Sequence, residues 1–175
     1  MATRGIVRFA KREEGVSFNE HPEKVHTQIY HHYDSYPDHL GVGIAKYLSD
    51  IRVVNGLGAQ KGNVLANGMG CLVAQVITHL KLGRHYGLEK DEIQEGNVYV
   101  DEPGKDRGDI DYTYYVWATE NKGIWMSIFG GGLGDNPDCI FVGKPEKLIE
   151  KYGNKEEYEA NQTPKSRNGL PYFGV

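Results

Sequence analysis

The chain has 175 residues, of which 39% are hydrophobic and 25% are charged, with a formal net charge of −4 and a pI near 6.0. These values predict one globular domain with a real core, and they argue against a general nucleic-acid binder, which would carry a basic patch or stripe. No apolar run approaches the roughly 20 residues that cross a bilayer. The first residues contain no signal-peptide apolar core, so we expect a soluble, cytoplasmic protein.

Two strands are predicted in the first part of the chain. Residues 4–10 include the segment GIVRF, which is rich in β-branched and aromatic side chains. A polar loop separates this segment from residues 24–33, where the second strand is expected. Strands that follow one another usually pair, so we expect these two to be neighbours.

A helix is predicted over residues 38–51. Pro37 biases the residue before it toward an extended conformation, and Asp38 can cap the helix that follows. The apolar positions recur at helical spacing: Leu40, Ile44, Tyr47, Leu48 and Ile51. Gly41 and Gly43 weaken the first turns by roughly 1 kcal/mol each relative to Ala. Glycines at that cost indicate that another backbone or a ligand approaches closely.

A second helix is predicted over residues 68–82, after a glycine-rich loop at residues 55–70. The glycines in this loop do not have the spacing of a dinucleotide-binding fingerprint. Asn67 is a suitable N-cap. Both helices should contribute to the core through Leu40, Ile44, Leu48, Leu72, Val76 and Leu80.

The rest of the chain to residue 153 is predicted to be mostly β. Strands are expected at residues 97–101, 109–119, 123–129 and 139–142. The turn at residues 120–123 gives a hairpin in which Gly123 takes positive φ. A C-terminal helix follows from Pro145 to Tyr152.

This order of elements predicts an α+β fold. We expect a mainly antiparallel sheet with two helices on one face and a C-terminal helix. Residues 1–153 form the domain, and residues 154–175 form a polar tail. The two cysteines, Cys71 and Cys139, are expected to be free thiols.

The segment at residues 28–41 is the strongest candidate for a functional site. It contains three histidines, three tyrosines and two aspartates in a strand that runs through a turn into a helix. Such concentrations of aromatic and titratable groups at a strand end are typical of binding or reactive sites. The residues expected to bind a ligand or partner are Tyr33, Asp34, Tyr36, Asp38 and Gly41. The free N–H groups at the start of the helix suit an anionic group.

Catalysis by proton transfer is the alternative use of this segment. His32 and Asp34 share one face of the predicted strand and lie about 7 Å apart at the rise of a β-strand. No nucleophile motif supports a hydrolase, since Ser35 lacks the Gly-x-Ser-x-Gly elbow. No known metal-ligand spacing is present either. We therefore expect no metal and no cofactor, and we expect a binding protein before an enzyme.

The start of the chain, Met-Ala-Thr-Arg-Gly, followed by the segment His-Tyr-Asp-Ser-Tyr-Pro, resembles a loose group of small phage and prophage proteins of unassigned activity. Those proteins open with a Met-Gly-Thr-Arg-like start, and this chain departs from them at Ala2. The resemblance implies an accessory protein of a phage or mobile element, acting in the host cytoplasm. Its partner would be a host protein or a small, anionic, nucleotide-like ligand, and the alternative is a small hydrolase that uses His32 and Asp34. Whether it forms a homo-oligomer is left open.

Overall fold

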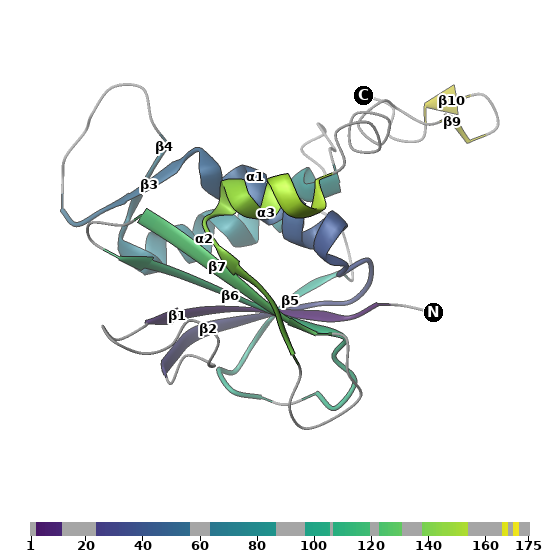
Figure 1. Ribbon diagram of the computed structural model, residues 1–175, viewed down its shortest axis with the longest axis horizontal. Helices are drawn as coiled ribbons and strands as arrows, with labels where there is room; N and C mark the ends of the chain where they lie inside the picture. The colour runs from purple at the N-terminus through teal and green to yellow at the C-terminus, as the bar shows by residue number, and fades with distance from the viewer. Residues whose placement is uncertain are drawn as a thin grey trace.

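One six-stranded sheet with helices on one face forms the framework of the molecule (Figure 1). The computed structural model describes residues 3–11, 24–56, 64–86, 97–105, 107–119, 123–130, 138–153, 166–167 and 170–171. The strand order is β5-β2-β1-β6-β7-β8. These strands are β1 (Gly5–Lys11), β2 (Lys24–His31), β5 (Val98–Asp101), β6 (Tyr112–Thr119), β7 (Gly123–Gly130) and β8 (Cys139–Gly143).

Four of the five pairings in this sheet are antiparallel, and the central pairing of β1 with β6 is parallel. The predicted α+β fold with a mainly antiparallel sheet is therefore confirmed. The expected pairing of the first two strands is confirmed as well, with Gly5 opposite His31. Gly123 begins β7 with a φ of 76°, as the hairpin prediction required. Residues 120–122 of that turn lie outside the described residues.

The helices α1 (Val42–Ser49), α2 (Gly68–Lys81) and α3 (Pro145–Tyr152) cover the same face of the sheet (Figure 1). All six core residues predicted on the first two helices are buried. They pack against strand residues that include Val7, Ile29 and Val116. Both cysteines are free and half-buried. No helix in the described part of the chain has the length and apolar character needed to span a membrane.

The opposite face of the sheet also contains a buried cluster, formed by Ala10, Tyr115, Trp117 and Phe129. Beside it, Arg8 donates hydrogen bonds to the side chains of Gln28, at 2.8 Å, and Tyr115, at 2.9 Å. Burial on both faces explains why β6 has a nearly continuous apolar and aromatic sequence at its centre.

The region between the first two helices differs from the prediction. The first helix ends at Ser49, and Ile51 begins a short strand, β3 (Ile51–Val54), instead of closing the helical stripe. This strand pairs in parallel with β4 (Val64–Asn67), which lies within the stretch predicted as a glycine-rich loop. Asn67 does occupy the N-cap position of α2, but its side chain makes no capping bond and accepts from the Gly56 N–H at 3.0 Å.

Most of the predicted tail lies outside the described residues. Within it, β9 (Ser166–Arg167) and β10 (Leu170–Pro171) form a two-residue antiparallel pair.

Truncating Leu48 or Leu72 to Ala should reduce the free energy of unfolding by about 2–5 kcal/mol, because both side chains are fully buried among other apolar groups. Urea denaturation followed by circular dichroism measures the change. The matched control is Val64→Ala, at a side chain that is 51% exposed, where we expect a change within about 0.5 kcal/mol. A loss below about 0.5 kcal/mol at both leucines would contradict the core described above.

Candidate functional site

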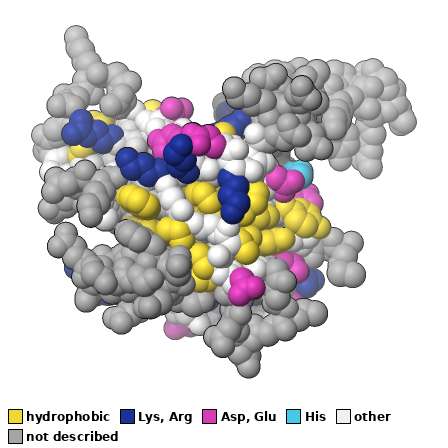
Figure 2. Space-filling model, in the orientation of Figure 1, with side chains coloured by type: hydrophobic (Ala, Val, Ile, Leu, Met, Phe, Trp, Pro, Cys, Tyr) yellow, Lys and Arg dark blue, Asp and Glu magenta, His cyan; other side chains and the backbone are white. Residues whose placement is uncertain are grey.

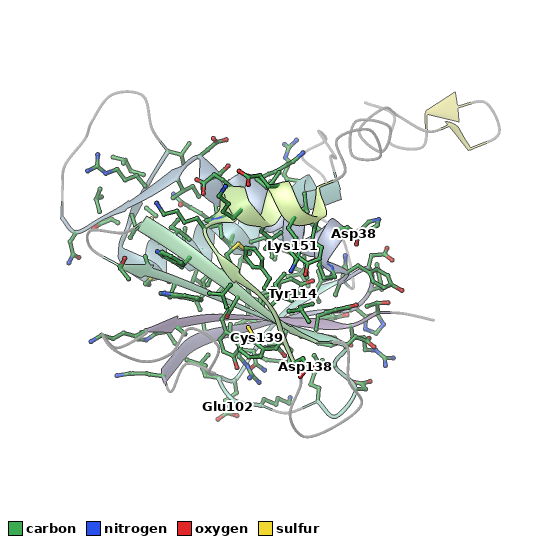
Figure 3. The ribbon with its side chains drawn as sticks, viewed as in Figure 1. Asp38, Glu102, Tyr114, Asp138, Cys139 and Lys151 are labelled. Atoms are coloured by element: carbon green, nitrogen blue, oxygen red, sulfur yellow. The ribbon has the colours of Figure 1, made fainter. Side chains whose placement is uncertain are left out.

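The junction between β2 and the first helix presents a group of exposed side chains, which we call the junction surface: Tyr33, Asp34, Tyr36, Asp38 and His39. β2 ends at His31, and a wide helical turn, η1 (Pro37–Gly41), leads into α1. Asp38 points outward from this turn (Figure 3). At that side of the molecule, acidic side chains and a histidine lie beside hydrophobic side chains (Figure 2).

Asp34 takes an unusual backbone conformation at the centre of this junction. Its φ is 57°, and it is the only non-glycine residue of the described chain with positive φ. Asp tolerates this left-handed region better than most residues, but the region is still sparsely populated. The kink places Tyr33 and Tyr36 on the surface with Ser35 buried between them.

Ser35 connects the junction to the sheet through backbone and side-chain hydrogen bonds. Its N–H donates to the carbonyl of Thr3 at 3.1 Å, and its carbonyl accepts from the Tyr114 hydroxyl at 2.6 Å. Its hydroxyl lies 2.9 Å from Nδ1 of His31. Burial raises the pKa of Tyr114 well above its ordinary value, so this hydroxyl remains a donor at any working pH. These bonds hold the turn rigidly over the centre of the sheet.

Two buried histidines, His31 and His85, continue the network beneath the junction surface, and the half-buried His79 lies next to them. Nε2 of His31 lies 3.1 Å from Nε2 of His85, and the His85 ring lies 6.4 Å from the His79 ring. Burial lowers the pKa of all three rings, to about 3 for His31, about 2 for His85 and about 4 for His79. At His79 the hydrogen bond to the Gly43 backbone opposes this lowering of the pKa, and the positive charge of Arg84 adds to it. All three are therefore neutral near pH 7, and they act as hydrogen-bonding groups without charge.

Glycines in and near this region allow other groups to pack closely. A Cβ at Gly43 would lie 2.7 Å from Cβ of His85, and a Cβ at Gly5 would lie 2.6 Å from Cβ of Ser35. At Gly41 a Cβ would lie 3.1 Å from the Tyr114 ring. The close approach that the sequence indicated at Gly41 and Gly43 is thus made by the protein's own residues, and Gly41 is buried in the core.

The two residues of the predicted catalytic pair lie near each other in sequence but make separate contacts. Nδ1 of His32 lies 2.9 Å from the Tyr30 hydroxyl. Within the described residues, the structure contains no hydrogen bond or ion pair between His32 and Asp34. The described residues also contain no group of three His, Cys, Asp or Glu side chains that could hold a metal ion. This geometry offers no oriented acid–base pair.

The prediction that Asp38 caps the helix is wrong. No side chain caps the start of η1, and Oδ1 of Asp38 lies 3.1 Å from Nδ1 of His39. The N–H groups of His39 and Gly41 both donate to the carbonyl of Tyr36.

The electrostatic character of the junction surface is acidic. Asp34 and Asp38 are exposed on it, and Asp109 and Asp111 lie nearby, where Arg4 pairs with both through its side chain and its N–H. Asp111 and Asp38 both act to raise the pKa of Tyr112, after the larger effects of burial and Tyr36. One arginine therefore faces several carboxylates. An anion at the start of the helix would meet unfavourable charge here.

The buried half of the site was not identified from the sequence. Ser35, His85 and Tyr114 were not predicted as site residues, although they hold the junction in place. For His31 a signal existed, because it shares the strand face of Ile29 and that face packs under the helices. No local pattern signals His85, which approaches from 54 residues away.

Comparison with known proteins does not place the chain in a family. No family model, no curated protein and no solved structure matches it. Function must therefore be argued from the chemistry of the site itself.

Replacing Gly43 by Ala should destabilise the protein by about 1–3 kcal/mol, because the new methyl group would overlap Cβ and the carbonyl of His85. Gly70→Ala is the matched control. Gly70 is exposed in α2, and no atom lies within 4 Å of the position that a Cβ would take, so Ala should there stabilise by up to about 1 kcal/mol. Chemical denaturation of both variants gives the two values. Equal effects at both positions would contradict the packing of His85 on α1.

Acidification should destabilise the fold through the buried histidines. An unfolded histidine binds a proton near pH 6.5, whereas His31 in the folded protein does so only near pH 3. The unfolded chain then holds more protons between these values, so stability is fully present above about pH 6.5 and is lost as pH falls toward 3. The urea midpoint measured from pH 7.5 to 4 should fall, and the His31 and His85 ring resonances should not titrate above pH 5. Ring resonances that titrate near pH 6.5 would refute the neutral network.

Proposed function

We propose that this chain is a non-catalytic accessory protein of a phage or mobile element, which binds a host protein in the host cytoplasm through the junction surface. The observation that carries the proposal is the exposure of Tyr33 and Tyr36, at 37% and 42%, on a turn held by buried hydrogen bonds. Exposed tyrosines on a rigid support are typical of protein-binding surfaces.

The rigidity of the turn supports binding because it lowers the entropy lost when a partner docks. Ser35 is held by Thr3, His31 and Tyr114, so the exposed residues on either side of it have little backbone freedom left to lose. The left-handed Asp34 adds local strain at the centre of the surface. Strained residues that persist on a well-supported turn occur most often at functional sites.

The chemistry of the surface favours a partner with Lys or Arg side chains. Asp34 and Asp38 present exposed carboxylates, and the Tyr36 ring lies 6.1 Å from the His39 ring and 6.2 Å from the Tyr112 ring. A Lys or Arg side chain can contact aromatic faces and carboxylates together. Of the two partners expected from the sequence, a host protein with a basic segment therefore fits this surface better than a small anionic ligand.

The alternative function, hydrolysis by His32 and Asp34, receives less support from the geometry. A general base must be oriented by a neighbouring group and must reach the proton it removes. His32 is instead bonded to the Tyr30 hydroxyl. The hydroxyl of Ser35 does lie beside His31, but Ser35 is fully buried, so a substrate has no access to it.

Selection of binding peptides tests the proposed function. A displayed library of random peptides is selected on the purified protein and counter-selected on the double variant Tyr36→Ser, Asp38→Asn. Enriched peptides should contain Lys or Arg, and the double variant should bind them at least about tenfold more weakly, which corresponds to 1.4 kcal/mol. Fluorescence anisotropy with synthetic peptides measures the change.

The matched control is the double variant Tyr99→Ser, Asp50→Asn, which removes an exposed tyrosine and an exposed aspartate outside the junction surface. It should bind the selected peptides as the unchanged protein does. Enrichment of acidic peptides, or equal losses in the two double variants, would refute the junction surface as the binding site.

A further inference from the structure

A cavity of about 380 Å³ that is open to solvent lies between α1 and α2, and none of its lining residues belongs to the junction surface. One side of α2 forms most of its wall, and Tyr47 of α1 together with Leu82 and Arg84 contributes the rest. The lining residues are Tyr47, Cys71, Ala74, Gln75, Thr78, His79, Leu82 and Arg84. Its volume is within the range of small-molecule sites, and its lining combines apolar groups with a few polar ones, as such sites do.

Two side chains of this wall have buried polar atoms with no hydrogen-bond partner in the described part of the chain: Oε1 of Gln75 and Nε2 of His79. The amide of Gln75 is oriented, because its Nε2 donates to the Leu65 carbonyl at 2.9 Å. Its oxygen is therefore left as an acceptor. Native proteins rarely leave such buried acceptors unused, and each one needs an explanation.

The protonation of His79 can be assigned from its neighbours. His79 hydrogen-bonds to the backbone of Gly43, and this bond acts to raise its pKa, so the ring donates to the Gly43 carbonyl. Because Nε2 has no partner, the donor is Nδ1. Burial lowers the pKa of the ring to about 4, so it is neutral near pH 7 and Nε2 carries a lone pair. His79 and Gln75 thus present two acceptors, four residues apart on the same helix face.

We propose that this cavity binds a small planar molecule with at least two N–H donors, of the nucleobase class, whose donors satisfy Oε1 of Gln75 and Nε2 of His79. The flat body of the molecule packs against the apolar wall that Ala74 and Leu82 provide. The site is separate from the junction surface and does not depend on the proposed partner protein.

Tyr47 is the side chain that moves when the ligand enters. Both acceptors are buried in the free protein, and the half-buried Tyr47 ring stacks on His79 with the ring centres 4.2 Å apart. Partly exposed side chains change rotamer rapidly, so this ring can turn aside and stack on the ligand.

Adenine is a suitable probe, with 6-dimethylamino-9-methylpurine as the matched control, because the control keeps the flat purine and has no N–H donor. Two-dimensional amide spectra of the full chain are recorded at millimolar concentrations of each compound. Adenine should shift the resonances of Cys71, Ala74 and Thr78, with a Kd of about 1 mM, as expected for a fragment of this size. The methylated purine should not shift them.

Two variants locate the site. His79→Asn keeps an N–H near the position of Nδ1 and removes Nε2, so adenine affinity should fall by about tenfold, whereas His39→Asn at an exposed histidine should change nothing. Ala74→Leu fills the cavity from an exposed helix position and should abolish binding with the amide spectrum otherwise preserved. Equal binding of both purines, shifts outside this wall, or no shift by adenine in the folded protein would overturn the proposal. In the last case ordered water satisfies the two acceptors.

Discussion

The hydrogen bond from the Tyr114 hydroxyl to the Ser35 carbonyl is the interaction on which the site depends. Tyr114 lies on β6 near the middle of the sheet, and Ser35 lies in the turn between β2 and the first helix. The bond is 2.6 Å long and fully buried, so its loss would leave both a hydroxyl and a carbonyl without a partner in an apolar environment. It therefore specifies where the chain leaves the sheet. The exposed tyrosines on either side of Ser35 have defined positions for the same reason.

The close packing around this bond requires residues without a Cβ and polar groups without a charge, which the glycines and the neutral histidines provide. Gly43 lets α1 approach the backbone of His85, and Gly41 lets the first turn lie on the Tyr114 ring. Either glycine weakens the helix, which is why the first helical turn gains most of its stability from tertiary contacts instead of its own propensity. The histidines beneath it supply hydrogen bonds without the cost of a buried charge.

The sequence predicted the fold well for elements that bury one face, because burial of one face produces a periodic pattern of apolar residues. Alternation and helical spacing located the strands of the sheet, the two long helical stripes and their buried residues, because one face of each element must leave water. It failed for β3 and β4, which are four residues long and whose parallel pairing depends on contacts that no local pattern records. It also overextended the first helix to Ile51, since an apolar residue at helical spacing was in fact the start of a strand.

For the site, local sequence identified the exposed residues but not their support. The concentration of tyrosines and aspartates is visible in the chain, whereas His85 and Tyr114 join the junction from 54 and 79 residues away. Their role follows only from tertiary structure. The glycines show the same limit: the sequence indicated a close approach at Gly41 and Gly43, but it could not distinguish a ligand from the protein's own side chains.

The neutral state of the histidines also constrains where their protons lie. Only one proton can occupy the contact between Nε2 of His31 and Nε2 of His85. In the first arrangement His31 donates through Nε2, and its Nδ1 accepts from the Ser35 hydroxyl. In the second arrangement His85 donates, so Nδ1 of His31 carries the proton and donates to the Ser35 oxygen. The Ser35 hydroxyl then turns to the His31 carbonyl, 3.4 Å away. Both arrangements satisfy every bond between these three residues and leave each ring uncharged. The network therefore holds the junction with its hydrogen bonds in either direction. It breaks only when an additional proton binds to one of the two histidines and gives that ring a charge.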